Sequence, residues 1–286
     1  MERLQVIEYP LRDVDAARRQ VVEYARDLEA RARAAFPDYR PPPYDPRRYA
    51  EVEGIPVFEE DDEADWDAML VPFRGHAGIW LNSRITNRQR RAFSVGHELA
   101  HCWFQHALET AQLRAQDREK YYRTPEAMQL ERLCDLGAAE LLMPAPAFQA
   151  AVEKQGFRAE TVRILSDTFD VSLQACAVRM VELRKGAPCA VGFFDWKRQG
   201  NEERREYRAD RVMRSEGFPF LFPSGKSVGR RSCIYACSMH TEEVSAIETF
   251  ELRRARHRLK VTAFPLHRGM TVDEPPRVCA LFELVA

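Results

Sequence analysis

The sequence contains no apolar stretch that approaches the roughly 18–20 residues needed to span a membrane. The first ten residues lack the basic and then apolar pattern of a secretory signal. The seven cysteines are an odd number, lie scattered along the chain and form no Cys-x-x-Cys pair. These absences argue against a membrane protein and against a disulfide framework. We therefore expect a cytoplasmic protein with no membrane partner.

The composition is that of a globular protein, with 45% hydrophobic and 30% charged residues. The net charge of −1 hides an asymmetry. Residues 185–286 carry 18 Lys and Arg against 13 Asp and Glu, so the first part of the chain is acidic and the last part basic. Such a division is typical of parts with different partners, and ordinary surface variation produces the same pattern.

The spacing of apolar residues changes along the chain. Helical spacing predicts helices over residues 13–35, 87–106, 126–142, 159–169 and 172–183. Extended segments are predicted at 55–58, 68–72, 78–82, 190–196, 232–238, 248–252, 259–264 and 277–284, with a hairpin turn at 199–201. We expect an α+β protein with three parts: a first domain over 1–144 with a short antiparallel sheet, a helical segment over 145–186 and a β-rich domain over 187–286.

The segment His97-Glu98-Leu99-Ala100-His101 has the spacing of a metal site. On a helix, two histidines four residues apart lie on one face, where both imidazoles can bind one zinc ion. Glu98 projects beside them, close enough to take a proton from a water molecule on the metal without binding the metal itself. The pattern also occurs by chance, so it requires a third ligand.

Glu131 and Asp135 supply candidates for that ligand, since they are four residues apart on the next long helix. One of them can complete the metal triad while the other accepts a hydrogen bond from a histidine. The alternative is a surface helix with two ordinary carboxylates. The small residues at 137–139 favour a helix packed tightly against another. His106 is a rival ligand, but it follows His101 by five residues and its spacing is that of a loop histidine.

Several ordered blocks between about residues 45 and 183 resemble the ImmA/IrrE family of metallopeptidases. They include the stretches at 54–57, 79–82, 91–101 and 138–144, together with Glu131. The resemblance implies a zincin-like fold, Zn²⁺ bound by His97, His101 and Glu131, and Glu98 as the general base. Where the family usually has an aromatic residue before the paired alanines, this chain has Gly137, which we interpret as a change in packing.

The resemblance also implies a substrate and a means of control. Members of the family typically cleave helix-turn-helix repressors and thereby switch on stress responses or phage defence. The order of peptidase, helix-turn-helix segment and GAF-like sensor domain is similar to that of IrrE and of CapP-type regulators of antiphage signalling (CBASS) operons. It implies derepression of a stress or defence operon after a DNA-damage signal, with single-stranded DNA as activator.

Zincin architecture further predicts where a substrate would bind. The extended segment at 78–82 directly precedes the metal-binding helix and is expected to be an edge strand. A peptide substrate would pair with such a strand through backbone hydrogen bonds. Ile79, Trp80 and Leu81 are therefore the predicted substrate-binding residues.

Two weaker patterns concern nucleic acid. Residues 165–176 fit a helix-turn-helix, with Gln174 and Arg179 as the available groove contacts, or else a structural helical pair. In the basic run at 253–260, an extended backbone would place four cations on one face, where they could follow a phosphate backbone or form a solvated strand surface. These four are Arg254, Arg256, Arg258 and Lys260.

Three classes of function follow from these patterns. The first is a zinc metalloendopeptidase that hydrolyses a repressor. The second is a zinc-dependent DNA-binding transcriptional regulator that does not cut. The third is a structural zinc protein, in which Glu98 would have no purpose.

Overall fold

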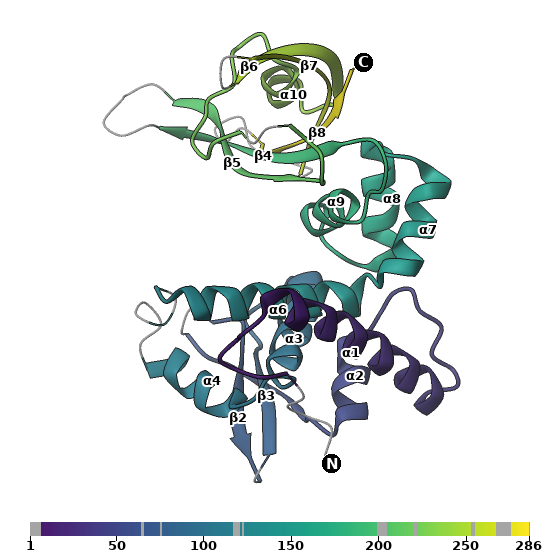
Figure 1. Cartoon of the computed structure of the whole chain (residues 1–286), viewed down its shortest axis with the longest axis vertical. Helices are drawn as coiled ribbons and strands as arrows, with labels where there is room; N and C mark the ends of the chain where they lie inside the picture. The colour runs from purple at the N-terminus through teal and green to yellow at the C-terminus, as the bar shows by residue number, and fades with distance from the viewer. Residues whose placement is uncertain are drawn as a thin grey trace. The chain divides into compact units, whose positions relative to one another are not determined.

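The computed structural model of the chain describes residues 7–63, 66–74, 76–116, 121, 123–198, 205–219, 222–252, 255–266 and 276–285. It divides into two compact units (Figure 1). Unit 1 comprises Met1–Ala145 with Thr168–Val171, and unit 2 comprises Pro146–Asp167 with Ser172–Ala286. None of the helices in the described ranges has the length and apolar character of a membrane span.

Three long helices form the framework of unit 1: α1 (Val14–Ala35), α3 (Arg88–His101) and α6 (Pro125–Leu142). Each begins at a side chain that accepts a hydrogen bond from the first helical turn, respectively Asp13, Asn87 and Thr124. Helix α6 packs against both α1 and α3. The three predicted helices are confirmed, with α3 ending at His101 instead of continuing to residue 106.

The sheet of unit 1 has the order β1-β3-β2, with strands Val57–Glu60, Ala68–Phe73 and His76–Asn82 for β1, β2 and β3. β3 pairs antiparallel with β2 and parallel with β1. The predicted short antiparallel sheet is therefore confirmed for β2 and β3 and wrong for β1. The β2–β3 hairpin is local, whereas β1 reaches β3 through a longer connection that the sequence pattern did not reveal.

Two further helices of unit 1 were not predicted. α2 (Pro46–Glu53) begins at Asp45, whose side chain accepts from the Arg47 N–H, and ends at Gly54 with a φ of 70°. The acidic cap, the proline in the first turn and the left-handed glycine are ordinary helix signals that the neighbouring prolines obscured. α4 (Ala107–Gln116) lies between the helices predicted at 87–106 and 126–142, where no element was predicted.

Unit 2 joins three helices to a five-stranded antiparallel sheet. The helices are α7 (Ala145–Gln155), α8 (Ala159–Phe169) and α9 (Leu173–Glu182), and α9 packs on the sheet. The sheet order is β5-β4-β8-β7-β6. Its strands, from β4 to β8, are Cys189–Arg198, Arg205–Arg214, Val244–Leu252, Ala255–Pro265 and Val278–Leu284. Helix α10 (Cys233–His240) contacts β6, β7 and β8.

Unit 2 differs from the prediction at three elements. Residues 232–238 were expected to form a strand, but they form α10, which Ser232 caps by accepting from the Tyr235 N–H. The charged strand β5 was missed because its Arg-rich sequence hides the alternation of a sheet. Helix α7 was missed because Pro144 and Pro146 resemble the stop of the preceding helix. The hairpin turn predicted at 199–201 lies outside the described residues.

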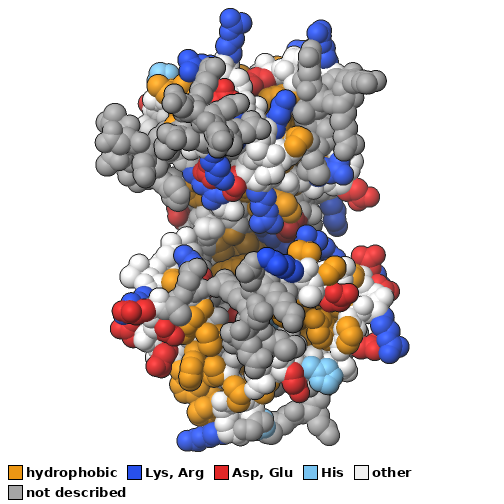
Figure 2. Space-filling view, turned by 90° about the vertical axis from the view of Figure 1, so that its left-hand side faces the viewer, with side chains coloured by type: hydrophobic (Ala, Val, Ile, Leu, Met, Phe, Trp, Pro, Cys, Tyr) orange, Lys and Arg blue, Asp and Glu red, His pale blue; other side chains and the backbone are white. Residues whose placement is uncertain are grey.

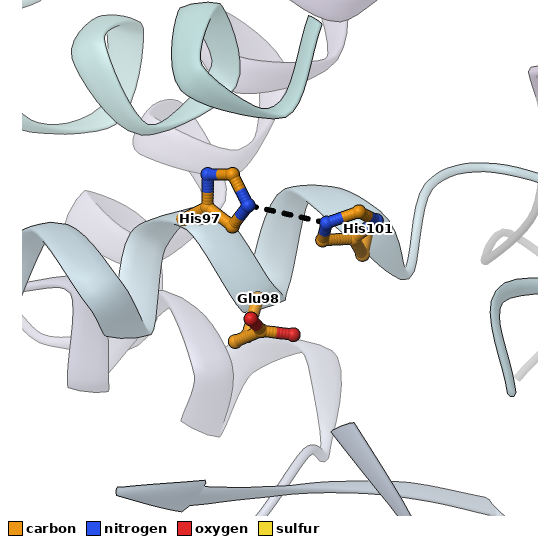
Figure 3. Close-up of side chains that lie close together, drawn as sticks. All are labelled: His97, Glu98 and His101. Carbon is orange, nitrogen blue, oxygen red and sulfur yellow. Dashed lines mark hydrogen bonds between the residues drawn. The ribbon is translucent and has the colours of Figure 1, made fainter. Parts of the chain in front are cut away.

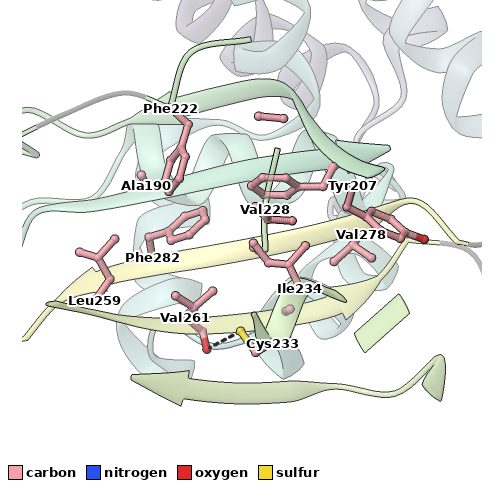
Figure 4. Close-up of a cluster of buried hydrophobic side chains, with 14 of the residues drawn as sticks. Ala190, Tyr207, Phe222, Val228, Cys233, Ile234, Leu259, Val261, Val278 and Phe282 are labelled. Carbon is pink, nitrogen blue, oxygen red and sulfur yellow. Dashed lines mark hydrogen bonds between the residues drawn. The ribbon is translucent and has the colours of Figure 1, made fainter. Parts of the chain in front are cut away.

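The core of unit 2 lies between one face of this sheet and α10. Phe194, Phe222 and Phe282 form a group of aromatic contacts within it, and Phe222 and Phe282 lie together with Ile234 in Figure 4. Because successive side chains of a strand point to opposite faces, the strand residues between these core positions lie on the other face of the sheet. All seven cysteines of the chain are buried and free. On the face shown in Figure 2, the Lys and Arg side chains of unit 2 lie at several separate places.

Candidate metal centre

The metal motif lies on α3 where this helix packs closely against α6. Gly137 allows this approach, because a Cβ atom at this position would lie 2.7 Å from the Ala100 Cβ and 2.9 Å from the Trp103 ring. Gly96 faces α6 as well, with ordinary contact distances of 3.4 Å or more to Ala138. Trp103 is fully buried and occupies the space that a side chain at 137 would need.

Three side chains meet between the two helices, with two imidazole nitrogens and both oxygens of one carboxylate. The Nε2 atoms of His97 and His101 lie 3.2 Å apart and face one another (Figure 3). Glu131 on α6 places one carboxylate oxygen 3.1 Å from the His97 Nε2 and the other 3.5 Å from the His101 Nε2. The three side chains are 14%, 4% and 14% exposed, so the group is largely shielded from water but can be reached.

Asp135 sets the orientation of His97. Its carboxylate lies 3.0 Å from the His97 Nδ1, on the side of the ring away from the donor group. In a neutral His97, a hydrogen bond from Nδ1–H to Asp135 would leave the lone pair of Nε2 directed at His101 and Glu131, as a metal ligand requires. The sequence left open which carboxylate has which role, and these contacts place Glu131 at the donor group and Asp135 behind the ring.

The electrostatics of the group suit a cation. Burial alone lowers the pKa of His97, but the hydrogen bonds to Asp135 and Glu131 outweigh it and raise that pKa to about 10. Burial would raise the pKa of Glu131, yet the two histidines hold it well below its usual range. Without a metal, the site therefore holds a positive charge on the His97 ring and a negative charge on the Glu131 carboxylate.

Glu98 lies on the adjacent side of the same helical turn (Figure 3) and is 4% exposed. One of its oxygens lies within 4.8 Å of the histidine donor atoms, so His97, Glu98 and His101 also form a group that could hold a metal ion. Two carboxylates thus compete for the third ligand position. Glu131 lies 3.1 and 3.5 Å from the two imidazoles, which favours it as the third ligand and leaves Glu98 beside the metal position.

The donor distances fit zinc. Ligands about 2.0–2.1 Å from a tetrahedral ion lie about 3.3–3.4 Å from one another. The three separations in this group are 3.1, 3.2 and 3.5 Å. Two imidazole nitrogens and one carboxylate are also the donor set of many catalytic zinc sites, which keep a fourth position open for water.

His106 lies apart from this group. It has a φ of 59°, and its side chain is 65% exposed and 3.8 Å from Glu109. The prediction of a loop histidine fits this position.

The predicted edge strand is wrong. β3 is the central strand of its sheet, and Ile79 pairs with both Val57 and Leu70. Ile79 and Leu81 are fully buried, whereas the Trp80 side chain is 38% exposed. Because the backbone of β3 is already paired on both sides, a substrate strand cannot add to residues 79–81. The edges available in this sheet are β1 and β2.

The residues predicted to contact nucleic acid belong to the basic run at 253–260 and to the predicted helix-turn-helix segment. Arg256, Arg258 and Lys260 are exposed and alternate along β7 as expected, and Lys260 lies 3.3 Å from Glu283. Arg254 lies outside the described residues. In the helix-turn-helix segment, Arg179 is only 2% exposed.

One neighbour of the site was not predicted. The backbone of Ile7 bonds to Trp103 and Gln105, directly after the metal-binding helix. This pairing brings the half-buried Tyr9 near α6, where burial, and then the charges of Glu126 and Glu131, raise the pKa of its hydroxyl. No local pattern in the N-terminal sequence indicated this contact.

Comparison with known proteins agrees with the geometry. Residues 50–181 match a family model described as the IrrE N-terminal-like domain of the M78 peptidases, a span of slightly less than half the chain. A search of curated proteins gave no match. A solved structure of a Mycobacterium tuberculosis transcriptional regulator is similar, with a TM-score of 0.55 and 16% identity over 94% of this chain and 80% of the other. At this identity, the likeness concerns the fold.

Proposed function

We propose that this protein is a zinc-dependent endopeptidase of the ImmA/IrrE family that cleaves a helix-turn-helix transcriptional repressor. The observation that carries the proposal is the convergence of His97, His101 and Glu131 within 3.1–3.5 Å of one another. The IrrE N-terminal-like match over residues 50–181 contains all of these residues.

The residues have distinct tasks in this proposal. His97, His101 and Glu131 would hold the zinc, and Asp135 would keep His97 in the tautomer whose Nε2 is free to bind. When bound, the zinc would supply Lewis acidity toward water and the scissile carbonyl. Glu98 accepts the proton from the attacking water and passes it to the leaving amine. With 4% exposure, Glu98 is largely withdrawn from bulk solvent.

Unit 2 is proposed to sense the signal that controls cleavage. The strand order β5-β4-β8-β7-β6, written in order along the chain, is 2-1-5-4-3, with α10 covering one face. This topology supports the GAF-like assignment. The activating ligand in this proposal is single-stranded DNA, with Arg256, Arg258 and Lys260 as the exposed cations that would contact it. Cleavage of the repressor would then derepress a stress or antiphage defence operon.

The alternative is a zinc-dependent DNA-binding regulator without proteolytic activity. Its recognition helix would be α9, but the two side chains expected to read a groove are engaged elsewhere. Arg179 is buried, and Gln174 accepts a hydrogen bond from Arg277 at 3.1 Å. Direct groove contact through α9 is therefore disfavoured, and the helical pair is better explained as support for the sheet.

The test is cleavage of a candidate repressor by wild type and Glu98→Gln, with products identified by mass spectrometry. An amide cannot accept the proton, so Glu98→Gln should keep the fold and bind zinc while cleavage falls by about 10²–10⁴-fold. Equal cleavage by both proteins would remove Glu98 from its role. Specific duplex binding by a protein that never cuts would favour the alternative.

A further inference from the structure

The two edges of the C-terminal sheet differ in how they are protected. Along β5, the segment at 225–228 covers the outer edge through hydrogen bonds between Ala209 and Lys226, Gly225 and Ala209, and Val228 and Tyr207. The register between β4 and β5 also shifts at Phe193 and Phe194. Irregular pairing and a covering segment are ordinary ways in which proteins prevent edge strands from pairing with another chain.

The other edge strand, β6, shows neither device in the part of the chain that the structure describes. Its pairing with β7 runs without a register shift over all nine residues. Ser245, Ala246 and Thr249 are exposed, and the Ile247 side chain is 57% exposed in the middle of the strand. A long, regular edge strand with an exposed apolar centre is the kind that pairs with another strand.

The backbone of β6 also has N–H and C=O groups that point outward, where another strand could pair with them. In an antiparallel sheet, each residue directs its N–H and C=O groups to one side of the strand, alternating along the chain. The Arg258 carbonyl accepts from Val285, so Arg258 bonds toward β8 and its partner Thr249 must direct its groups away from β7. By alternation, Ser245 and Ile247 do the same. Among the described residues, no backbone hydrogen bond reaches these three positions from the outer side.

We propose that β6 pairs antiparallel with β6 of a second copy of this chain, around a two-fold axis at Ile247. The two sheets would then join into one continuous sheet across the dimer. In this register, Ile247 lies opposite Ile247 of the other copy, Ser245 opposite Thr249, and Val244 opposite Phe250. Seven residues of each strand pair, and no like charges face each other among them.

The other registers are poorer. An axis at Glu248 would place two carboxylates opposite each other in the pair of closest backbone approach, which is destabilising. An axis at Ala246 would pair only five residues of each strand. An axis at Thr249 would also pair seven residues of each strand, but it places the exposed Ile247 opposite Glu251. The isologous arrangement around Ile247 is as long, has no charge conflict and sets the two exposed isoleucines opposite each other, and a two-fold dimer is the commonest oligomer of soluble proteins. Self-complementarity of this kind is the reason to assign the edge to a second copy.

The register is tested by disulfide crosslinking of the full-length protein. In Ile247→Cys, the two new thiols would face each other in a hydrogen-bonded pair with Cα atoms about 5.5 Å apart, a distance that suits a disulfide. In the matched control Thr249→Cys, the two thiols would lie about 13 Å apart along the strands, since each residue adds about 3.3 Å. All native cysteines are buried, so background crosslinking should be low.

The expected result is a disulfide-linked dimer in Ile247→Cys under mild oxidation, with Thr249→Cys no more crosslinked than wild type. Sedimentation should show wild type as a dimer at high micromolar concentration and Ile247→Lys as a monomer, because two ammonium groups would then meet beside Lys260. Circular dichroism should show that the variants fold. Monomeric wild type, equal crosslinking of the two cysteine variants, or a dimer that survives Ile247→Lys would each overturn the proposal.

Discussion

Substituting Gly137 by alanine should damage the metal site from a distance. Gly137 lies on α6, six residues beyond Glu131, where α6 approaches α3 closely. A methyl group there would lie 2.7 Å from the Ala100 Cβ and 2.9 Å from the Trp103 ring. Normal carbon contacts are about 3.5–4.0 Å, so the helices must separate locally by about 1 Å.

Two opposing effects determine the change in stability. Alanine is better than glycine in a helix interior by about 1 kcal/mol. Overpacking of a full core costs about 1–3 kcal/mol, and Trp103 is completely buried, so the clash is not easily relieved. The net loss of unfolding free energy should be about 0–2 kcal/mol. The effect on zinc affinity should be larger than the effect on stability. Glu131 lies only 3.1 and 3.5 Å from the two imidazoles with which it would bind the metal, so a small shift of α6 changes both distances.

Zinc affinity, measured by competition with a chromophoric chelator, should therefore fall by about 10-fold or more in Gly137→Ala. Gly96→Ala is the matched control, since it adds a methyl group between the same two helices at ordinary contact distances. The exchange variant with Ala100→Gly and Gly137→Ala returns the methyl group to the other helix and should recover part of the affinity. Unchanged affinity in Gly137→Ala, or equal losses in Gly137→Ala and Gly96→Ala, would refute this explanation of the glycine.

Three other predictions concern charge. Asp135→Asn should weaken zinc binding by about 10–100-fold, measured by the same competition, because the hydrogen bond that orients His97 loses its charge. Metal-free protein should become less stable as the pH rises. The pKa of His97 is raised from 6.5 to about 10, so the charged ring contributes fully below about pH 6.5 and that contribution is lost toward pH 10. Thermal denaturation with a chelator tests this, and rising stability over that window would contradict it. Reversing Arg256 and Arg258 to Glu should weaken binding of single-stranded oligonucleotides and flatten its salt dependence, measured by fluorescence anisotropy at two salt concentrations, and equal binding would return these arginines to a solvated strand.

The metal motif could be predicted from the sequence because its chemistry depends on local spacing. His97 and His101 are one helical turn apart, so the helix alone brings them together. Glu131 required a resemblance or a structure, since its place beside them depends on how α6 packs against α3. Spacing alone did not distinguish Glu131 from Asp135; the resemblance favoured Glu131 as the ligand, and the distances to the two imidazoles agree with it.

The errors arose where tertiary structure overrides local pattern. Residues 232–238 are apolar enough for a strand, but Ser232 caps a helix that packs on three strands of the C-terminal sheet. β3 was expected to be an edge strand, because a sequence does not reveal that β1 pairs on its other side. Tyr9 reaches the site only through the pairing of Ile7 with the chain after His101. Long-range pairing of this kind leaves no periodic signal.

The most direct test of the proposed zinc site is the metal content of purified protein. Elemental analysis of carefully handled wild type should find about one zinc per chain, and His97→Ala, His101→Ala and Glu131→Ala should each lose most of it, because each removes one of three converging donors. Wild-type protein without zinc, or a Glu131→Ala variant that retains it fully, would contradict the assignment of the site.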